Sequence, residues 1–224
     1  MIRRIRLADR QLPNYSTAEE LTNTLTHAFG GMLGIAALVL CLIKAIHFRS
    51  ALEITAAAIY GGCMVALYCV SSVYHGLKPS LAKKVMQVID HCTIYLLIAG
   101  SYTVVSLAAL RQYSPALAWG MVIFQWTLAA IAITLTAIDL KAFQAFSMTC
   151  YVGMGWAILP FMKQIRLVLG SQGFYFLLAG GIAFTIGAVL YGIGSKTRWI
   201  HSVFHVFVVL GSALQFCSIY FYAI

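Results

Sequence analysis

Long stretches without a charged residue dominate the chain. Between successive Asp, Glu, Lys and Arg residues there are seven charge-free windows of 20 residues or more, namely 21–43, 54–77, 91–110, 112–138, 142–162, 167–195 and 199–224. A helix needs about 20 apolar residues to cross the hydrocarbon core of a bilayer. Lipid offers the backbone no hydrogen-bond partner, so each window is predicted to be helical. The short segments of alternating polarity that build a membrane barrel are not seen.

The pattern therefore predicts an all-α bundle of seven transmembrane helices. The expected spans are 17–46, 52–74, 86–109, 116–138, 143–162, 174–194 and 199–222. Residues 1–16 form a short basic tail, flexible or interfacial, and residues 17–224 form one membrane domain. The tail is not expected to be a cleavable signal peptide, because the apolar run begins only at Leu21 and is too long for such a signal.

Composition supports the same class of protein. Of the 224 residues, 62% are hydrophobic and only 9% are charged, whereas a soluble domain carries about 25% charged residues. A single water-soluble core and an intrinsically disordered chain are both excluded. The net charge of +9 does not indicate a nucleic-acid partner, because most basic residues lie in short loops or at the ends of spans.

The basic residues are distributed unequally between the two sides of the expected bundle. Ten lie on the side of the N-terminus and five on the opposite side. The first group is Arg3, Arg4, Arg6, Arg10, Lys78, Lys83, Lys84, Lys141, Lys196 and Arg198, and the second is Lys44, Arg49, Arg111, Lys163 and Arg166. Basic loops face the cytoplasm. We expect a multi-pass protein of the cell (inner) membrane, with a cytoplasmic N-terminus and a C-terminus outside.

Ionisable side chains gather at one end of the expected bundle. Such groups are rare at membrane depth and are usually functional. Alternating span directions place five of them on the cytoplasmic side: His27, His75, Asp90, His201 and His205. His47 falls in the opposite loop and is expected to be solvated.

His201 and His205 are four residues apart, so their rings share one helix face. Two imidazoles at this spacing can bind one Zn²⁺, and His75 supplies a third at the same depth. Two helical histidines that simply hydrogen-bond are the alternative. The cysteines include no CxxC pair, so a thiolate site is not expected.

Ser71 and Asp90 are the candidate partners of this metal site. Ser71 precedes His75 by four residues and shares its helix face, although a serine can also bond back to its own helix carbonyl. Asp90 opens the third span. Its alternative explanations are an interaction with the helix dipole or pairing with Lys83 or Lys84.

A polar stripe begins the first helix. Glu20, Asn23 and His27 recur at i, i+3 and i+7. Thr17 and Glu20 have the spacing of a capping box, which predicts a helix start near residue 17. Capping alone would explain Glu20, and interhelical hydrogen bonding would explain the other two. His91 faces away from Asp90 and is expected to be a packing or interfacial residue.

These residues lie in motifs that together resemble the bacterial hemolysin III family. The motifs are Glu20-x-x-Asn23-x-x-x-His27, Ser71-Ser72-Val73-Tyr74-His75, DHCTIYLLIAGSYT at 90–103, and His201-Ser202-Val203-Phe204-His205. That family belongs with the progestin and adipoQ receptors, which include the adiponectin receptors, and more distantly resembles alkaline ceramidases. The resemblance runs from Glu20 almost to the end of the chain. Val104 departs from it, because the family usually has proline there.

The resemblance implies a seven-helix fold with a zinc site on its cytoplasmic side. By the family pattern His75, His201 and His205 are the ligands, and Ser71 and Asp90 hold the water at the metal. Three imidazoles and a water form the open site typical of catalytic zinc, with Asp90 as general base and Ser71 orienting the water or stabilising an oxyanion.

Three functions remain open at the level of the sequence. The first is a zinc-dependent lipid hydrolase, cleaving an amide or ester at the inner leaflet. The second is a non-enzymatic membrane-homeostasis or receptor-like protein with structural zinc. A pore-forming cytolysin is disfavoured, because a pore needs a wet lining and no span carries a polar stripe along its length. Membrane lipids are the expected partners. Gly30-x-x-x-Gly34 permits close helix contact within or between chains, so the oligomeric state stays open.

Overall fold

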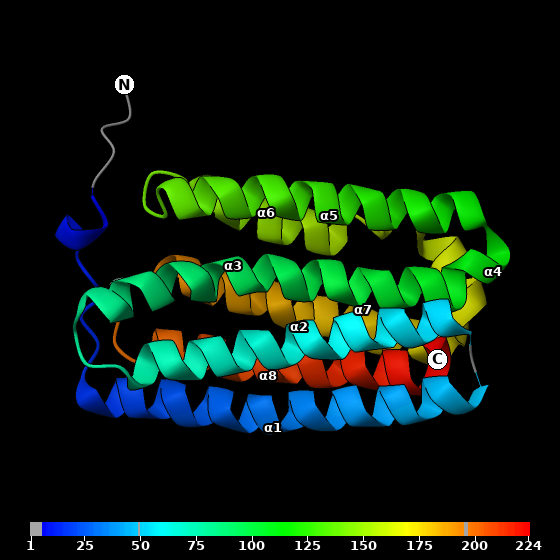
Figure 1. Cartoon of the computed structure of the whole chain (residues 1–224), viewed down its shortest axis with the longest axis horizontal. Coiled ribbons are helices and arrows are strands. Elements are labelled where there is room, and N and C mark those ends of the chain that lie inside the picture. The colour runs from blue at the N-terminus through cyan, green and yellow to red at the C-terminus, as the bar shows by residue number, and fades with distance from the viewer. Residues whose placement is uncertain (1–5, 49, 195–196) are drawn as a thin grey trace.

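The computed structural model describes residues 6–48, 50–194 and 197–224, and every described element is a helix. The long helices lie side by side along one axis (Figure 1). Four residues that contribute to the predicted charge asymmetry, Arg3, Arg4, Arg49 and Lys196, lie outside the described residues.

The elements follow one another with short connections. They are η1 (Leu7–Asp9), α1 (Thr17–Phe48), α2 (Ala51–Gly76), α3 (Leu81–Val104), η2 (Val105–Leu110), α4 (Arg111–Tyr113), α5 (Pro115–Ile138), α6 (Gln144–Trp156), η3 (Leu159–Phe161), α7 (Met162–Gly194), α8 (Ile200–Ser218) and η4 (Ile219–Ala223). The third helix departs from α geometry just after Val104, where η2 is a π-helical turn.

Six segments of the described chain are long and apolar enough to cross a membrane, which indicates a multi-pass membrane protein. They are Thr17–His47, Ala51–Gly76, Leu81–Tyr113, Pro115–Ile138, Gln144–Ile193 and Ile200–Ala223. The fifth has 50 residues and covers all but one residue of each of two predicted spans, 143–162 and 174–194. Within it α7 leaves helical geometry at Gly170 (φ 67°, ψ 172°). Figure 1 shows that α6 and α7 run in opposite directions.

The first helix begins where the sequence predicted, but its capping box lies one residue earlier. The Ser16 backbone N–H donates to Glu19 Oε2 over 2.9 Å, and the Glu19 N–H donates to Ser16 Oγ over 3.3 Å. Ser-x-x-Glu and Thr-x-x-Glu are both present in the sequence, and the structure uses the first. The prediction that Thr17 and Glu20 form the box is therefore wrong, and the Glu20 side chain is left for another partner.

Glycines allow α1 and α2 to pack closely. A Cβ atom at Gly61 would lie 2.6 Å from the Cα of Leu38, and one at Gly30 would lie 2.4 Å from the Tyr68 ring. Gly34 likewise approaches the backbone of Val65. The Gly30-x-x-x-Gly34 pattern thus serves contact within this chain, as small residues do between membrane helices.

The arrangement brings four helix ends together. α1, α3 and α8 begin at the end of the bundle where α2 finishes, and the C-terminus lies at the opposite end (Figure 1). The segment Leu81–Tyr113, with 83% of its most apolar window buried, is the most enclosed of the six. Asp90 is on this central helix, and the histidines of α2 and α8 lie at the same end of the bundle.

Candidate functional site

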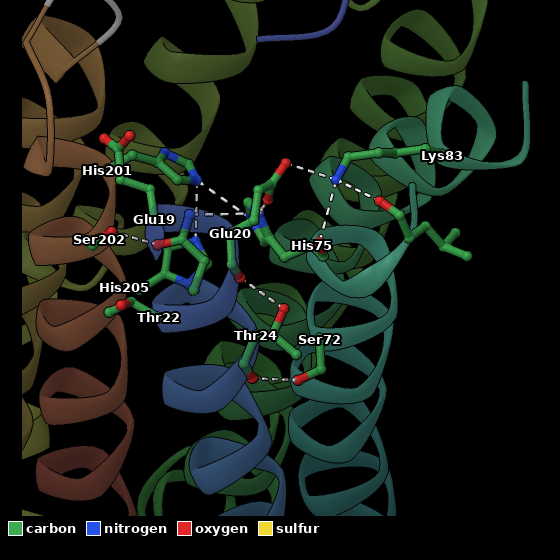
Figure 2. Close-up of polar contacts among 12 residues, drawn as sticks. Glu19, Glu20, Thr22, Thr24, Ser72, His75, Lys83, His201, Ser202 and His205 are labelled. Carbon is green, nitrogen blue, oxygen red and sulfur yellow. Dashed lines mark hydrogen bonds and ion pairs between the residues drawn. The ribbon is translucent and has the colours of Figure 1, made fainter. Parts of the chain in front are cut away.

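Three histidines converge where α2 ends and α8 begins. His201 Nε2 lies 3.4 Å from His75 Nε2 and 3.0 Å from His205 Nε2. One ligand nitrogen from each ring lies within 4.8 Å of the other two. His75 and His205 are buried. Figure 2 shows the three side chains pointing toward one another, His75 from α2 and His201 and His205 from α8. We call them the histidine triad.

Two of the three separations within the triad are close to those in a zinc site. With Zn–N bonds of about 2.0–2.1 Å and tetrahedral angles, two ligand nitrogens lie about 3.3–3.4 Å apart. The separation between His75 and His201, 3.4 Å, agrees with this value, and that between His201 and His205, 3.0 Å, is slightly shorter. Neutral imidazoles are ligands that zinc prefers. The donor set fits a metal with one coordination position left open.

Two contacts from α1 fix the beginning of α8. Trp199, at the N-cap, has φ 68°, and its backbone N–H donates to Glu19 Oε1 over 2.7 Å. Ser202 Oγ donates to Asn23 Oδ1 over 2.7 Å. Both contacts flank His201, so the first two turns of α1 determine where this ligand lies.

All three residues of the predicted polar stripe on α1 reach the triad or its neighbours. Glu20 Oε2 lies 2.6 Å from His75 Nδ1. The His27 ring stacks on that of His205, with 3.7 Å between centroids and 22° between planes. Neither ring nitrogen of His27 has a partner among the described residues. Interhelical hydrogen bonding, the alternative considered for the stripe, therefore accounts for Asn23 but not for His27.

Ser71 and Asp90 meet beside the triad. The Ser71 hydroxyl of α2 and the Asp90 carboxyl of α3 are close enough to interact. Both residues line a cavity of about 140 Å³ that also reaches His27 and His205. The structure thus brings the predicted pair together next to a candidate metal ligand.

The rest of this cavity is mainly apolar. Its walls include Leu67, Ile94, Leu97, Ile98, Phe184 and Val208. A second cavity, of about 50 Å³, shares the wall residues Ser101, Tyr102, Gly155, Trp156, Gly181 and Gln215 with the first. Together the two cavities lead from the triad into the middle of the bundle.

Lys83 has a role that the sequence did not predict. It is only 3% exposed, and its ammonium donates to Glu20 Oε1 over 2.7 Å. Lys84 instead reaches the backbone carbonyl of Ala8. Neither contact is with Asp90, the partner suggested for these lysines. One feature of the sequence could have indicated this role. Lys83 follows the N-cap residue Ser80 by three positions, which places it in the first turn of α3, and its N–H donates to the Ser80 side chain.

His91 is closer to the site than its sequence position suggested. It lines the cavity beside Asp90. Its Nδ1 lies 2.8 Å from the Gln87 carbonyl, which can only accept, so Nδ1 carries the proton. Its Nε2 then accepts a hydrogen bond from the Tyr191 hydroxyl, with 2.9 Å between the two atoms. The sequence predicted that His91 is a packing or interfacial residue. Its contact with Tyr191 could not be predicted, because no sequence pattern relates two residues that are 100 positions apart.

Tyr15, from the N-terminal tail, covers the triad. Its ring stacks on His201 with 4.8 Å between centroids and 21° between planes. Burial raises the pKa of the Tyr15 phenol, so it stays protonated. Arg10 Nη2 donates to the Ile138 carbonyl over 3.0 Å, which holds this part of the tail against the end of α5. His47, at the other end of α1, is exposed as predicted.

Known proteins resemble the chain over almost its whole length. A family model described as "Haemolysin-III related" matches residues 15–216. Hemolysin-3 of Bacillus cereus is 36% identical over 206 residues, which cover 92% of each chain. A hemolysin-3 homolog of Bacillus subtilis strain 168 is 34% identical over 210 residues, 94% of this chain and 97% of that protein. Monocyte to macrophage differentiation factor of Homo sapiens is 26% identical over 211 residues, 91% of this chain and 84% of that protein.

No solved structure matches the chain. The matched region nevertheless includes the triad, Ser71, Asp90 and the polar stripe of α1. The resemblance predicted from the motifs is confirmed by the family match and by two relatives above 30% identity. The chain belongs to the hemolysin III family.

Proposed function

We propose that this protein is a zinc-dependent hydrolase that cleaves an amide or ester bond of a lipid at the inner leaflet of the cell membrane. The observation that carries the proposal is the position of the histidine triad. One of its members, His205, lines an apolar cavity whose wall also holds Ser71 and Asp90. A metal site, an acid–base group and room for a lipid chain thus adjoin one another.

His75, His201 and His205 would hold the zinc ion through Nε2. Zn²⁺ in such an open three-histidine site supplies Lewis acidity, which activates water and polarises a carbonyl group. The imidazoles are neutral when they act as ligands, so the ion keeps its full charge for that purpose.

Asp90 would transfer the proton, and Ser71 would orient the Asp90 carboxylate for that transfer. The Asp90 carboxylate accepts a proton from the attacking water and returns it to the leaving group, as a general base and then a general acid. The Ser71 hydroxyl, on the same cavity wall, would donate to that carboxylate and fix its orientation. Once that carboxyl is protonated, the single O–H of Ser71 would be able to donate instead to the oxyanion on the substrate carbonyl.

The cavity indicates the class of substrate. Its apolar walls suit an acyl chain, while Ser71, Asp90 and the candidate ligand His205 line it beside the triad. A lipid whose chain enters the cavity would place its amide or ester linkage beside Asp90. The triad lies at the end of the bundle, which is the depth of the lipid headgroups.

A structural role for zinc is the second candidate function. Helices have little hydrophobic reason to associate in lipid, so polar contacts contribute strongly to their arrangement. The triad joins the end of α2 to the beginning of α8, and Ser202 and Asn23 add a bond from α8 to α1. In this alternative the metal fixes the helices of a non-enzymatic homeostasis or receptor-like protein.

The proposal includes seven membrane crossings with the triad on the cytoplasmic side. The reversal of direction between α6 and α7 supports an odd number of crossings, as do the start of α1 and the C-terminus at opposite ends of the bundle (Figure 1). The excess of basic residues on the side of the N-terminus supports the orientation.

Fusions to the C-terminus test this orientation. We expect alkaline phosphatase fused after Ile224 to be active, because it folds outside the cytoplasm, and a green fluorescent protein at the same position to be dark. The same two reporters placed after Lys141 serve as the control and should give the opposite result. A fluorescent C-terminal fusion would place the triad on the outer side.

Metal analysis tests the triad. The purified protein should contain about one Zn²⁺ per chain, as expected for one tetrahedral site. His75→Ala, His201→Ala and His205→Ala should each deplete it, because each removes one ligand. His47→Ala, at the other end of α1, should not. Equal zinc content in the wild type and in His201→Ala would contradict the site.

Asp90→Asn tests the hydrolytic role. The amide is nearly isosteric and can still hydrogen-bond, but it cannot accept the proton, so hydrolysis should fall by about 10²–10⁴-fold. Zinc content and folding should remain. Turnover would be measured on zinc-loaded protein with a panel of ceramides, acyl-amides and phospholipids.

Asp9→Asn, on the exposed segment η1, provides the matched control and should leave the rate unchanged. Zinc-dependent turnover that is equal in the wild type and in Asp90→Asn would remove Asp90 from the mechanism. If none of the lipids is cleaved, the structural-zinc alternative replaces the hydrolase.

A further inference from the structure

We propose that Glu20 and Lys83 form a relay that positions His75 for metal binding and sets the zinc affinity of the site. The inference rests on the proposed zinc site and extends it. Glu20 is on α1, His75 on α2 and Lys83 on α3, so three helices meet in this relay (Figure 2).

The Glu20 carboxylate bridges the other two side chains with separate oxygens. Oε2 lies 2.6 Å from His75 Nδ1, and Oε1 accepts from Lys83 Nζ over 2.7 Å. Both distances are those of strong hydrogen bonds to a charged group. The carboxylate reaches this position because Glu19, rather than Glu20, forms the capping box of α1.

The bridge determines which nitrogen of His75 faces the metal. A carboxylate only accepts hydrogen bonds, so His75 Nδ1 carries the proton. Nε2 then bears the lone pair, and it is this atom that lies 3.4 Å from His201 Nε2. Histidine ligands in metal sites are commonly oriented in this way, with the second ring nitrogen donating to a carboxylate, which also raises the basicity of the ligand.

Lys83 supplies the positive charge that balances Glu20. The Glu20 side chain is only 21% exposed, and a charge that is largely removed from water is costly without a partner. Lys83 is itself 3% exposed. Its ammonium has three donors, and the structure provides three acceptors: Glu20 Oε1, the His75 carbonyl at 3.2 Å and the Leu77 carbonyl at 2.9 Å. The charge of Lys83 therefore acts on the ligand through Glu20.

A different role for Lys83 must be separated from this one. The carbonyls of His75 and Leu77 are at the end of α2, so Lys83 also closes the last turn of that helix. If closing the turn were its whole contribution, removal of Lys83 would weaken zinc binding whether or not Glu20 is present. If it acts through Glu20, its removal has no further effect once Glu20 is gone.

Zinc affinity, measured by competition with a chelator on the purified full-length protein, tests the relay without any substrate. Glu20→Ala removes both the hydrogen bond and the charge, and should weaken binding by about 10–100-fold. Glu20→Gln keeps an acceptor for Nδ1 and should lose less. Lys83→Met should also weaken binding. The double variant Glu20→Ala/Lys83→Met should bind zinc as Glu20→Ala does.

Two variants serve as matched controls. Lys84→Met removes the neighbouring lysine, which contacts Ala8, and Glu53→Gln neutralises a buried acid in the capping box of α2, at the opposite end of that helix. Both should retain wild-type zinc affinity. Thermal unfolding of each metal-free variant, measured in parallel, shows whether that variant is folded. If Glu20→Ala does not fold, the comparison is made with Glu20→Gln instead.

The outcomes distinguish the relay from the metal site itself. A wild-type protein that binds no zinc would overturn the proposed function. Tight zinc binding in the wild type with equal affinity in Glu20→Ala, or in Glu20→Gln if the former is unfolded, would overturn the relay alone. Additive losses in the double variant would show that Lys83 acts on the end of α2 and not through Glu20.

Discussion

The convergence of three imidazole nitrogens at one end of a lipid-embedded bundle is the interaction on which the rest of the structure depends. His75, His201 and His205 come from two helices that are far apart in the sequence, and their Nε2 atoms face one another. Nitrogen lone pairs that face each other in a largely buried cluster need a cation or a proton between them. The helix ends, the caps and the buried charges around the triad all serve to hold this geometry.

The surroundings of the triad differ on its two sides. On one side Glu20 and Lys83 form a charge-balanced pair that reaches His75. On the other side Ser71 and Asp90 lie on the wall of an apolar cavity. A metal held between them would be supported by fixed charges and would face a space suited to a lipid chain. The same arrangement supports both the hydrolytic and the structural role, which differ in whether Asp90 moves a proton.

Much of this was predictable from the sequence, because lipid imposes simple rules. Charge-free windows predicted the helices, and the i, i+4 spacing of His201 and His205, with His75 at the same depth, predicted the triad. Gly170 lies in the connection predicted between spans 143–162 and 174–194, but the helix that begins at Met162, before this break, was not predicted. The register of the α1 cap was wrong, since Ser16 and Thr17 both have a glutamate three residues later. The role of Lys83 was missed because the sequence does not distinguish it from its neighbour Lys84. Only the tertiary structure shows that Lys83 is buried and contacts Glu20.

X-ray absorption at the zinc edge of the zinc-loaded protein tests the central claim most directly, because it reports the ligands themselves. The account predicts a first shell of four nitrogen or oxygen atoms at about 2.0–2.1 Å. Three of these should show the outer-shell scattering of imidazole rings. Sulfur ligands at about 2.3 Å, or a spectrum unchanged in His201→Ala, would contradict it.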